Sequence, residues 1–110
     1  MAVSDGFEPR LFEVSNSSGY TFMKQVPAFR QEDLLTEDVY ILDTYHELFI
    51  WVGEKSNKFE KSGALKDANQ LLQSLSDGRK KEDVHIVEVA PTREPPIFKV
   101  QFPAWDEKYS

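Results

Sequence analysis

Cysteine is absent from this chain of 110 residues, so neither a disulfide scaffold nor a cysteine-liganded zinc site can form. Histidine occurs only twice, and the two residues are not spaced as a helical metal-binding pair. The five glycines are isolated, which excludes a glycine-rich phosphate loop. No serine lies in a Gly-x-Ser-x-Gly nucleophile motif. These absences leave no candidate catalytic residue, and we expect a protein that is not an enzyme.

Long apolar segments and an excess of basic charge are also missing. No apolar run approaches the roughly 20 residues needed to span a bilayer, and the first residues lack the basic and apolar regions of a signal peptide. The net charge of −6, from 13 Lys and Arg against 19 Asp and Glu, disfavours a nucleic-acid partner. We therefore expect a soluble, cytoplasmic protein without integral membrane association.

Two apolar segments dominate the middle of the chain. Residues 39–42 and 48–52 are continuous apolar runs, which is typical of strands covered on both faces. The polar residues 43–47 between them suit a hairpin turn. Further strands are predicted at residues 10–14, 20–26 and 84–89, and residues 97–102 are predicted to form a final edge strand or another short element. Residues 1–9 are predicted to be a flexible lead, and residues 10–110 a single domain.

The clearest helix is predicted from Asn57 to Leu75. Asn57 can cap this helix, and Glu60 three residues later completes a capping-box-like pair. Apolar residues recur on one arc of roughly 120°, and they are Ala64, Leu65, Ala68, Leu71, Leu72 and Leu75. A single helical turn is predicted at residues 30–35. Strands, a hairpin and a long helix in this order predict an α/β (α+β) sheet with a helix on each face.

Two carboxylates, Asp38 and Glu60, stand where the first buried strand and the long helix are predicted to begin. In one interpretation Glu60 is a helix-capping partner and Asp38 only flanks its strand. In the other they are ligands of a calcium ion, which prefers carboxylate and carbonyl oxygens. The chain has no EF-hand pattern, so such a site would be discontinuous. Spacing alone does not decide between the two interpretations.

The basic run at residues 79–81 is a second candidate site, because it could contact an anionic phosphoinositide headgroup. Glu82 and Asp83 follow at once and cancel much of its positive potential. A solvated loop is therefore the favoured interpretation, since lipid-binding clusters usually carry more unopposed charge.

Four segments carry a resemblance to a known family. They are PRLFEVSN at 9–16, QEDLLTEDVYILDTYHELFIWVG at 31–53, EKSGAL at 60–65 and EPPIFKVQFPAWDEKYS at 94–110. The middle segment contains the pattern D-x-x-x-L-D…(F/Y)-x-W-x-G. The chain resembles a single gelsolin-homology domain of the gelsolin and villin family, and is most similar to the sixth, C-terminal repeat.

The resemblance implies a fold and a function. The fold is gelsolin-like, with a central mixed five-stranded sheet between one long helix and one short helix. The function is calcium-controlled actin regulation by severing, capping or bundling filaments, associated with the cytoskeleton. Calcium becomes the favoured interpretation of the two carboxylates. Its ligands would be an oxygen of Asn16, the carbonyl of Glu37, and the carboxylates of Asp38 and Glu60.

A partner surface is predicted on the long helix from the spacing of its residues, and the resemblance supports it, because actin-binding repeats dock through this element. Opposite the apolar arc this helix presents Phe59, Gly63, Lys66, Gln70 and Gln73. Phe59 either folds back onto the preceding loop or anchors a partner, which would be actin or a neighbouring gelsolin-like repeat. The alternative function is a metal-independent packing domain that does not bind actin itself.

Overall fold

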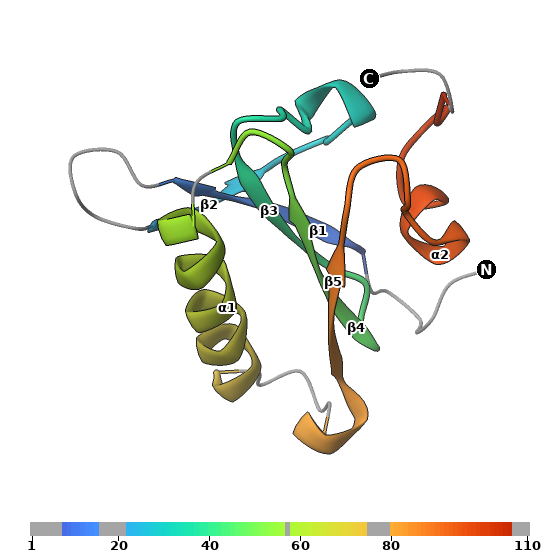
Figure 1. The fold of residues 1–110 in the computed structure, drawn as a ribbon. Helices are drawn as coiled ribbons and strands as arrows, with labels where there is room; N and C mark the ends of the chain where they lie inside the picture. Colours follow the sequence, from blue (N-terminus) through green and yellow to red (C-terminus); the bar gives the residue numbers. More distant parts are fainter. Residues whose placement is uncertain (1–7, 16–21, 57, 75–79, 107–110) are drawn as a thin grey trace.

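The computed structural model describes residues 8–15, 22–56, 58–74 and 80–106, without the side chains at 15, 22, 58–61 and 81. A five-stranded sheet lies between α1 on one face and α2 on the other (Figure 1). The elements are β1 (Arg10–Ser15), β2 (Phe22–Val26), η2 (Gln31–Asp33), β3 (Val39–Asp43), β4 (Glu47–Val52), α1 (Lys58–Gln73), η3 (Lys81–Asp83), β5 (His85–Val89) and α2 (Pro96–Lys99). The predicted sheet between one long and one short helix is confirmed.

The sheet is mixed, and its strands lie in the order β2-β1-β3-β4-β5. Neighbouring strands are antiparallel except β4 and β5, which run parallel. A parallel pair requires a crossover connection, and α1 lies within that connection. Val39 pairs with both Val14 and Val52. The start of β3 therefore lies beside the ends of β1 and β4.

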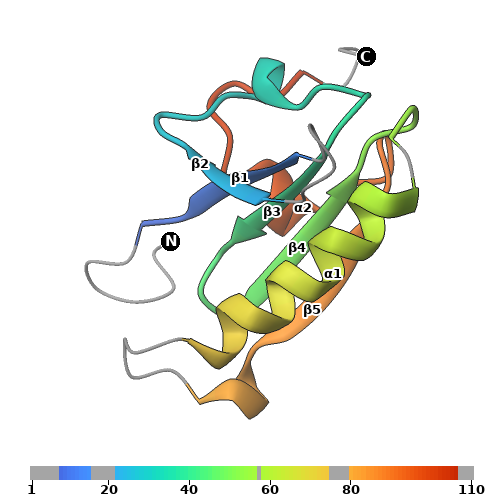
Figure 2. The ribbon, with the colours of Figure 1, turned by 90° about the vertical axis from the view of Figure 1, so that its left-hand side faces the viewer.

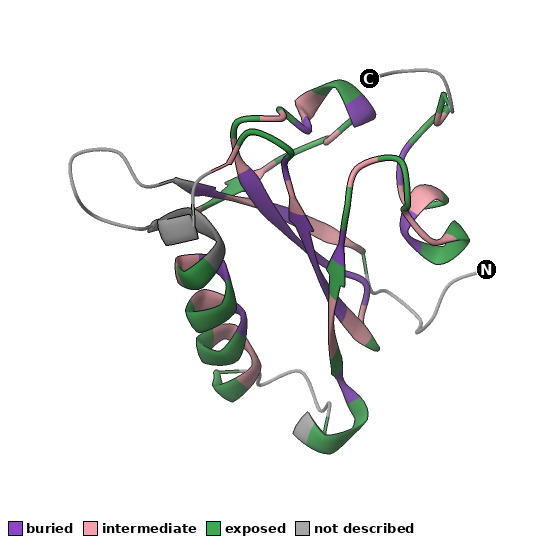
Figure 3. Ribbon diagram, viewed as in Figure 1, coloured by how far each residue is buried: buried purple, intermediate pink, exposed green. Residues whose placement is uncertain are grey.

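The apolar run of β3 divides between the two faces of the sheet. Val39 and Ile41 belong to the cluster under α1, whereas Tyr40 and Leu42 belong to the cluster under α2. Every residue of β3 is buried, and Figure 3 shows the same for the centre of the sheet. Successive strand side chains point to opposite faces, so a strand covered on both faces needs apolar residues throughout, as predicted.

The long helix buries a narrow face. α1 packs against β1, β2, β3 and β4, and Figure 2 shows it in front of the sheet with α2 behind. Ala64 and Ala68 are both 0% exposed. Leu65 is 42% exposed, so its predicted place in the core is wrong. Two small alanines bring the helix backbone close to the sheet, and the contact does not extend round the helix to Leu65.

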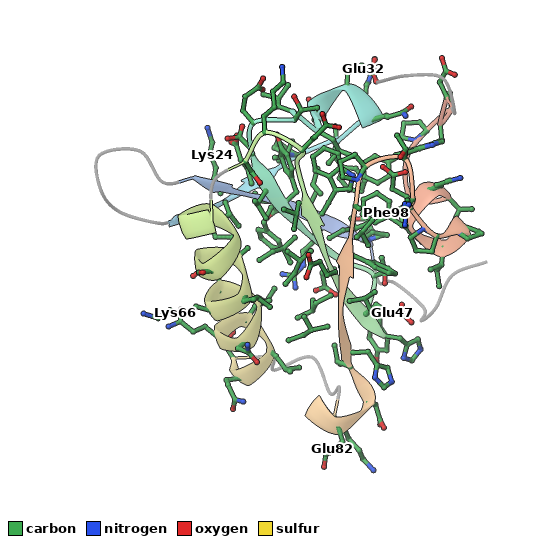
Figure 4. All side chains as sticks on the ribbon, in the orientation of Figure 1. Lys24, Glu32, Glu47, Lys66, Glu82 and Phe98 are labelled. Carbon is green, nitrogen blue, oxygen red and sulfur yellow. The ribbon has the colours of Figure 1, made fainter. Side chains whose placement is uncertain are left out.

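Of the two alternatives predicted for residues 97–102, the edge strand is wrong and the short element is confirmed, because Pro96–Lys99 form the short helix α2 and turns follow. Pro95 occupies the N-cap and Pro96 the first helical position, where a fixed φ favours a helix. Phe98 and Phe102, one helical turn apart, are 0% and 4% exposed. Figure 4 shows Phe98 pointing from α2 toward the sheet. The four-residue spacing of these phenylalanines was the signal for a helix.

Smaller predictions have separate outcomes. The helical turn predicted at residues 30–35 is confirmed as η2. The predicted hairpin joins β3 to β4 and includes Tyr45 with a φ of 84°. The predicted cap Asn57 and the predicted last helical residue Leu75 lie outside the described residues.

Candidate functional site

The candidate calcium residues Glu37 and Asp38 lie in a turn that leads into β3. The Asp38 backbone N–H donates to the Leu35 carbonyl at 3.1 Å, which closes the turn. The segment after β4 supports this turn through two backbone hydrogen bonds. The Gly53 N–H donates to the Asp38 carbonyl at 3.0 Å, and the Lys55 N–H donates to the Thr36 carbonyl at 2.7 Å. The turn therefore has a defined position against the end of β4.

Gly53 is required for this close approach. A Cβ atom at this position would lie 2.4 Å from the Thr36 carbonyl oxygen and 2.5 Å from that of Asp38. Both atoms belong to the backbone, so they cannot move away as a flexible side chain could. The final glycine of the family-like pattern therefore has a physical role, because it lets the segment after β4 support the candidate site.

Tyr40 supports the same turn from within the fold. Its hydroxyl accepts a hydrogen bond from the Leu35 backbone N–H at 3.1 Å. Burial raises the pKa of Tyr40, and it outweighs the opposite effect of this hydrogen bond. A tyrosine phenol is already neutral at neutral pH, and burial favours this neutral form further, so no charge develops beneath the turn.

The oxygens of the turn are available to a ligand. Glu37 is exposed and Asp38 is half-buried. No described residue donates a hydrogen bond to the Glu37 carbonyl or to the Asp38 carboxylate. A carbonyl beside a carboxylate is the hard-oxygen chemistry that calcium prefers. These two predicted ligands therefore fit the ion.

The other two predicted ligands are less completely described. Glu60 lies in the first turn of α1, but its side chain lies outside the described part, as does the whole of Asn16. Strand β1, which precedes Asn16, ends beside the start of β3. Strand β4 also ends beside the start of β3, and α1 begins a few residues later. Among the described residues, no group of three or more Asp, Glu or His side chains is placed to hold a metal ion.

The predicted partner stripe lies on the outer side of α1. Lys66, Gln70 and Gln73 are exposed, and Gly63 is half-buried. Figure 4 shows Lys66 pointing away from the sheet. A shallow hollow of about 480 Å³ is lined by Lys66, Asn69, Gln70, Gln73 and Ser74. The backbone of Phe59 lies in the first turn of the same helix, but its side chain lies outside the described part.

Sequence reasoning missed two residues of this hollow, Asn69 and Ser74. Both hydrogen-bond within α1, since Asn69 donates to the Leu65 carbonyl and Ser74 to the Leu71 carbonyl, each at 2.9 Å. Their spacing from Lys66 and Gln70 by three or four residues places them on the same side of a helix. That spacing was the signal that could have found them.

The predicted basic run is mixed in charge. Lys80 is exposed, and exposed Glu82 and Asp83 follow it in η3. Arg79 lies outside the described residues, as does the side chain of Lys81. Positive and negative side chains this close together weaken each other's electrostatic potential at an anionic surface. Within the described part, no helix has the length and apolar character needed to cross a bilayer.

Comparisons with known proteins give the family. The model of the gelsolin repeat matches residues 22–99. Chicken (Gallus gallus) gelsolin is 39% identical over 106 residues, covering 96% of this chain and 14% of the relative. Mouse (Mus musculus) advillin is 42% identical over 97 residues, covering 88% of this chain and 12% of the relative. The chain thus spans only a small part of the length of these relatives.

A solved structure shares the fold. A chain in the crystal structure of the Thorarchaeota ProGel/rabbit actin complex superposes with a TM-score of 0.70 and 20% sequence identity. The match covers 86% of this chain and 99% of that chain. At this identity the likeness shows the fold alone. Together, the family model over residues 22–99 and the identity to gelsolin over nearly the whole chain show that this chain belongs to the gelsolin repeat family.

Proposed function

We propose that this chain is a calcium-responsive, actin-binding repeat of a longer cytoplasmic protein that severs, caps or bundles actin filaments. The observation that carries the proposal is 39% identity to chicken gelsolin over 96% of the chain. The solved complex with the same fold contains actin, which supports actin as the partner. Membership of the gelsolin repeat family makes the chain a binding domain and not an enzyme.

The proposed calcium site uses Asn16, Glu37, Asp38 and Glu60. Bound calcium would neutralise the negative charge of two carboxylates that come from different elements. Asp38 would supply one of them beside the Glu37 carbonyl, and Glu60 would supply the other from the first turn of α1. An ion held by both would link the start of β3 to the start of the helix that carries the proposed partner surface.

Calorimetric titration with calcium tests this site on the isolated chain. Glu60→Gln should weaken binding at least tenfold, or about 1.4 kcal/mol, because too few charged ligands remain. Glu82→Gln is the matched control, since Glu82 is exposed in η3 and should leave the affinity unchanged. Magnesium should bind more weakly, because a discontinuous site does not tighten to its octahedral geometry.

Thermal unfolding gives an independent measurement. An ion that binds only the folded chain must raise the melting temperature. If saturating calcium leaves the melting curve of the wild-type chain unmoved, the calcium assignment is wrong.

We propose the outer side of α1 as the actin-binding surface. Lys66 and Gln70 are exposed there, and Leu65 beside them is 42% exposed. Such a surface could supply an apolar contact with a polar rim around it. Phe59, one to two turns earlier on this helix, is the proposed aromatic anchor.

Co-sedimentation with actin filaments and binding to monomeric actin test this surface with and without calcium. Phe59→Ala should weaken binding by about 1–3 kcal/mol, the range of an aromatic hot spot, and leave the melting temperature nearly unchanged. Ile97→Ala is the matched control, because it shortens an apolar side chain that is 40% exposed on the opposite face of the sheet. A large loss of folding stability in Phe59→Ala would show that Phe59 belongs to the core.

The second candidate function is a packing domain that contacts a neighbouring repeat and does not bind actin itself. Two exposed residues at α2 favour it, because Ile97 is 40% and Val100 is 73% exposed. The resemblance at residues 94–110 supports the sixth repeat as the counterpart in the family. A folded chain that binds no actin in either calcium condition would establish this second function over the first.

A further inference from the structure

A pocket of about 140 Å³ lies at the end of the sheet where β4 and β5 both terminate. Its walls come from η2 and the residues after it, the end of β4, the segments that follow β4 and β5, and the segment after α2. Figure 1 shows that these segments, far apart in sequence, come together at this end of the molecule. The outer side of α1 contributes no residue to the pocket, which is therefore separate from the proposed actin surface.

The pocket has aromatic walls. Trp51 is 4% exposed, and its indole N–H donates to the Glu94 carboxylate at 3.0 Å. Trp105 is half-buried and packs edge-on against Phe98 and Phe102, with ring centroids 6.0 and 5.2 Å away. The chain contains only these two tryptophans, and both line this pocket.

The pocket is held in place before any ligand arrives. Gln31 is 7% exposed and makes two hydrogen bonds to the backbone of Asp106, one from its amide nitrogen at 2.9 Å and one to its amide oxygen at 2.8 Å. This pair fixes the segment after α2 against η2. A wall fixed in this way lowers the entropic cost of binding.

The charge of the pocket has one sign. Glu54, Glu94 and Asp106 line it, and none of its lining residues is Lys, Arg or His. Glu94 accepts one hydrogen bond from Trp51, which leaves further acceptor sites on its carboxylate. No described residue pairs with the exposed Glu54 side chain. The pocket therefore favours a cationic occupant.

The volume limits the size of that occupant. Pockets for drug-sized molecules measure about 300–1,000 Å³, whereas this one measures about 140 Å³. The charged end of a single side chain suits this volume better than a whole metabolite.

We propose that this pocket binds the guanidinium group of an arginine presented by a partner protein. A guanidinium is planar, stacks on aromatic faces and binds a carboxylate through two parallel hydrogen bonds. Trp105 supplies the aromatic face, and Glu94 and Glu54 supply the carboxylates. A lysine ammonium lacks the planar shape and binds such a wall less well. The proposal depends on neither calcium nor actin.

The test uses the whole chain with a short probe, acetyl-Gly-Arg-Gly-amide, and the matched peptide with citrulline in place of arginine. Citrulline keeps the shape of arginine but is uncharged. The two indole N–H resonances report directly on the pocket, and a calcium chelator is present throughout. The arginine peptide should shift both resonances at up to about 10 mM, where a site with a Kd of about 1 mM is largely occupied. The citrulline peptide should not.

Variants of the pocket carboxylates then test whether these groups bind the peptide. Glu54→Gln combined with Glu94→Gln should weaken binding of the arginine peptide at least tenfold, while the new amide at position 94 still offers an oxygen to the Trp51 indole. Glu82→Gln lowers the negative charge in η3, outside the pocket, and should change nothing. Equal shifts by citrulline, no shift at all, or full binding by the double variant would overturn the proposal. Calcium chloride is then added with the chelator omitted. If calcium displaces the peptide and causes the same shifts, the pocket is an inorganic cation site, and this result would also overturn the proposal.

Discussion

The two faces of the sheet are built from different side chains. Under α1 the buried cluster is aliphatic apart from Phe12. Among the described side chains, α1 places the small residues Ala64 and Ala68 within this cluster, and its partly buried Leu71 and Leu72 pack against it. Under α2 the cluster is rich in rings, with Phe98 of the short helix packed edge-on to Phe49 at 5.6 Å between centroids. A long helix can cover its face with several small or partly buried side chains along its length, whereas a four-residue helix must use large side chains. The same sheet therefore tolerates different changes on its two sides.

The largest expected effect is on the aromatic face. Phe98 is 0% exposed and contacts the rings of Phe49, Phe102 and Trp105. Phe98→Ala should lower the free energy of unfolding by about 3–5 kcal/mol, because a cavity forms and several ring contacts are lost. Urea unfolding measures this value, and Ile97→Ala on the exposed side of α2 should cost about 1 kcal/mol or less. Similar losses in both variants would contradict the assigned orientation of α2.

A smaller effect is expected on the aliphatic face. Ala68→Leu inserts a branched side chain where α1 meets the sheet, and overpacking of this kind costs about 1–3 kcal/mol. The matched change outside the contact is Leu65→Ala, which should cost about 1 kcal/mol or less because Leu65 is 42% exposed. Urea unfolding again decides. A neutral Ala68→Leu would mean that α1 is seated less closely than its buried alanines indicate.

The smallest effect concerns a carboxylate of α1. Asp67 has one buried oxygen without a hydrogen-bond partner among the described residues. Burial raises the pKa of Asp67, and Lys66 opposes that change. The folded state therefore holds this proton more tightly than the unfolded chain, whose pKa is 3.8. Stability due to this group is present below that value and is lost as the pH rises through the higher pKa of the folded state.

Asp67→Asn should therefore stabilise the chain at neutral pH by about 0.5 kcal/mol, and the gain should vanish at a pH below 3.8. Melting temperatures at the two pH values measure the difference. Asp83→Asn is the control, because Asp83 is exposed in η3. An equal gain at both pH values would exclude ionisation of Asp67 as the cause.

The sequence is informative where a local pattern determines the structure. Continuous apolar runs predict β3 and β4 because each buries both faces, and helical periodicity predicts α1. The sequence is less informative where distant segments decide. It leaves an edge strand and a short element open where α2 forms, because the ring cluster that receives Phe98 comes from β4 and from later residues. It places Leu65 in the core, because periodicity does not report how wide a helix contact is.

The candidate site shows the same division. Residues Glu37 and Asp38 follow from a family-like pattern, and their role as calcium ligands stays a prediction. The acidic pocket between Trp51 and Trp105 is not visible in sequence, because its residues come from four separate segments. The ion pair of Arg10 with the fully buried Asp43, at 2.7 Å, is hidden for the same reason. Local sequence indicates only a polar hairpin residue at position 43.

The parallel pairing of β5 has a consequence for the order of folding. Strands β1 to β4 pair with one another in antiparallel fashion, and the hairpin from β3 to β4 closes a very short loop. β5 pairs with β4 only after the chain has passed through α1 and η3. Closing the longer loop costs more chain entropy, and such non-local pairings slow folding. We expect β5 to join last, so that a chain stopped before this strand would hold an antiparallel sheet whose β4 edge is still open.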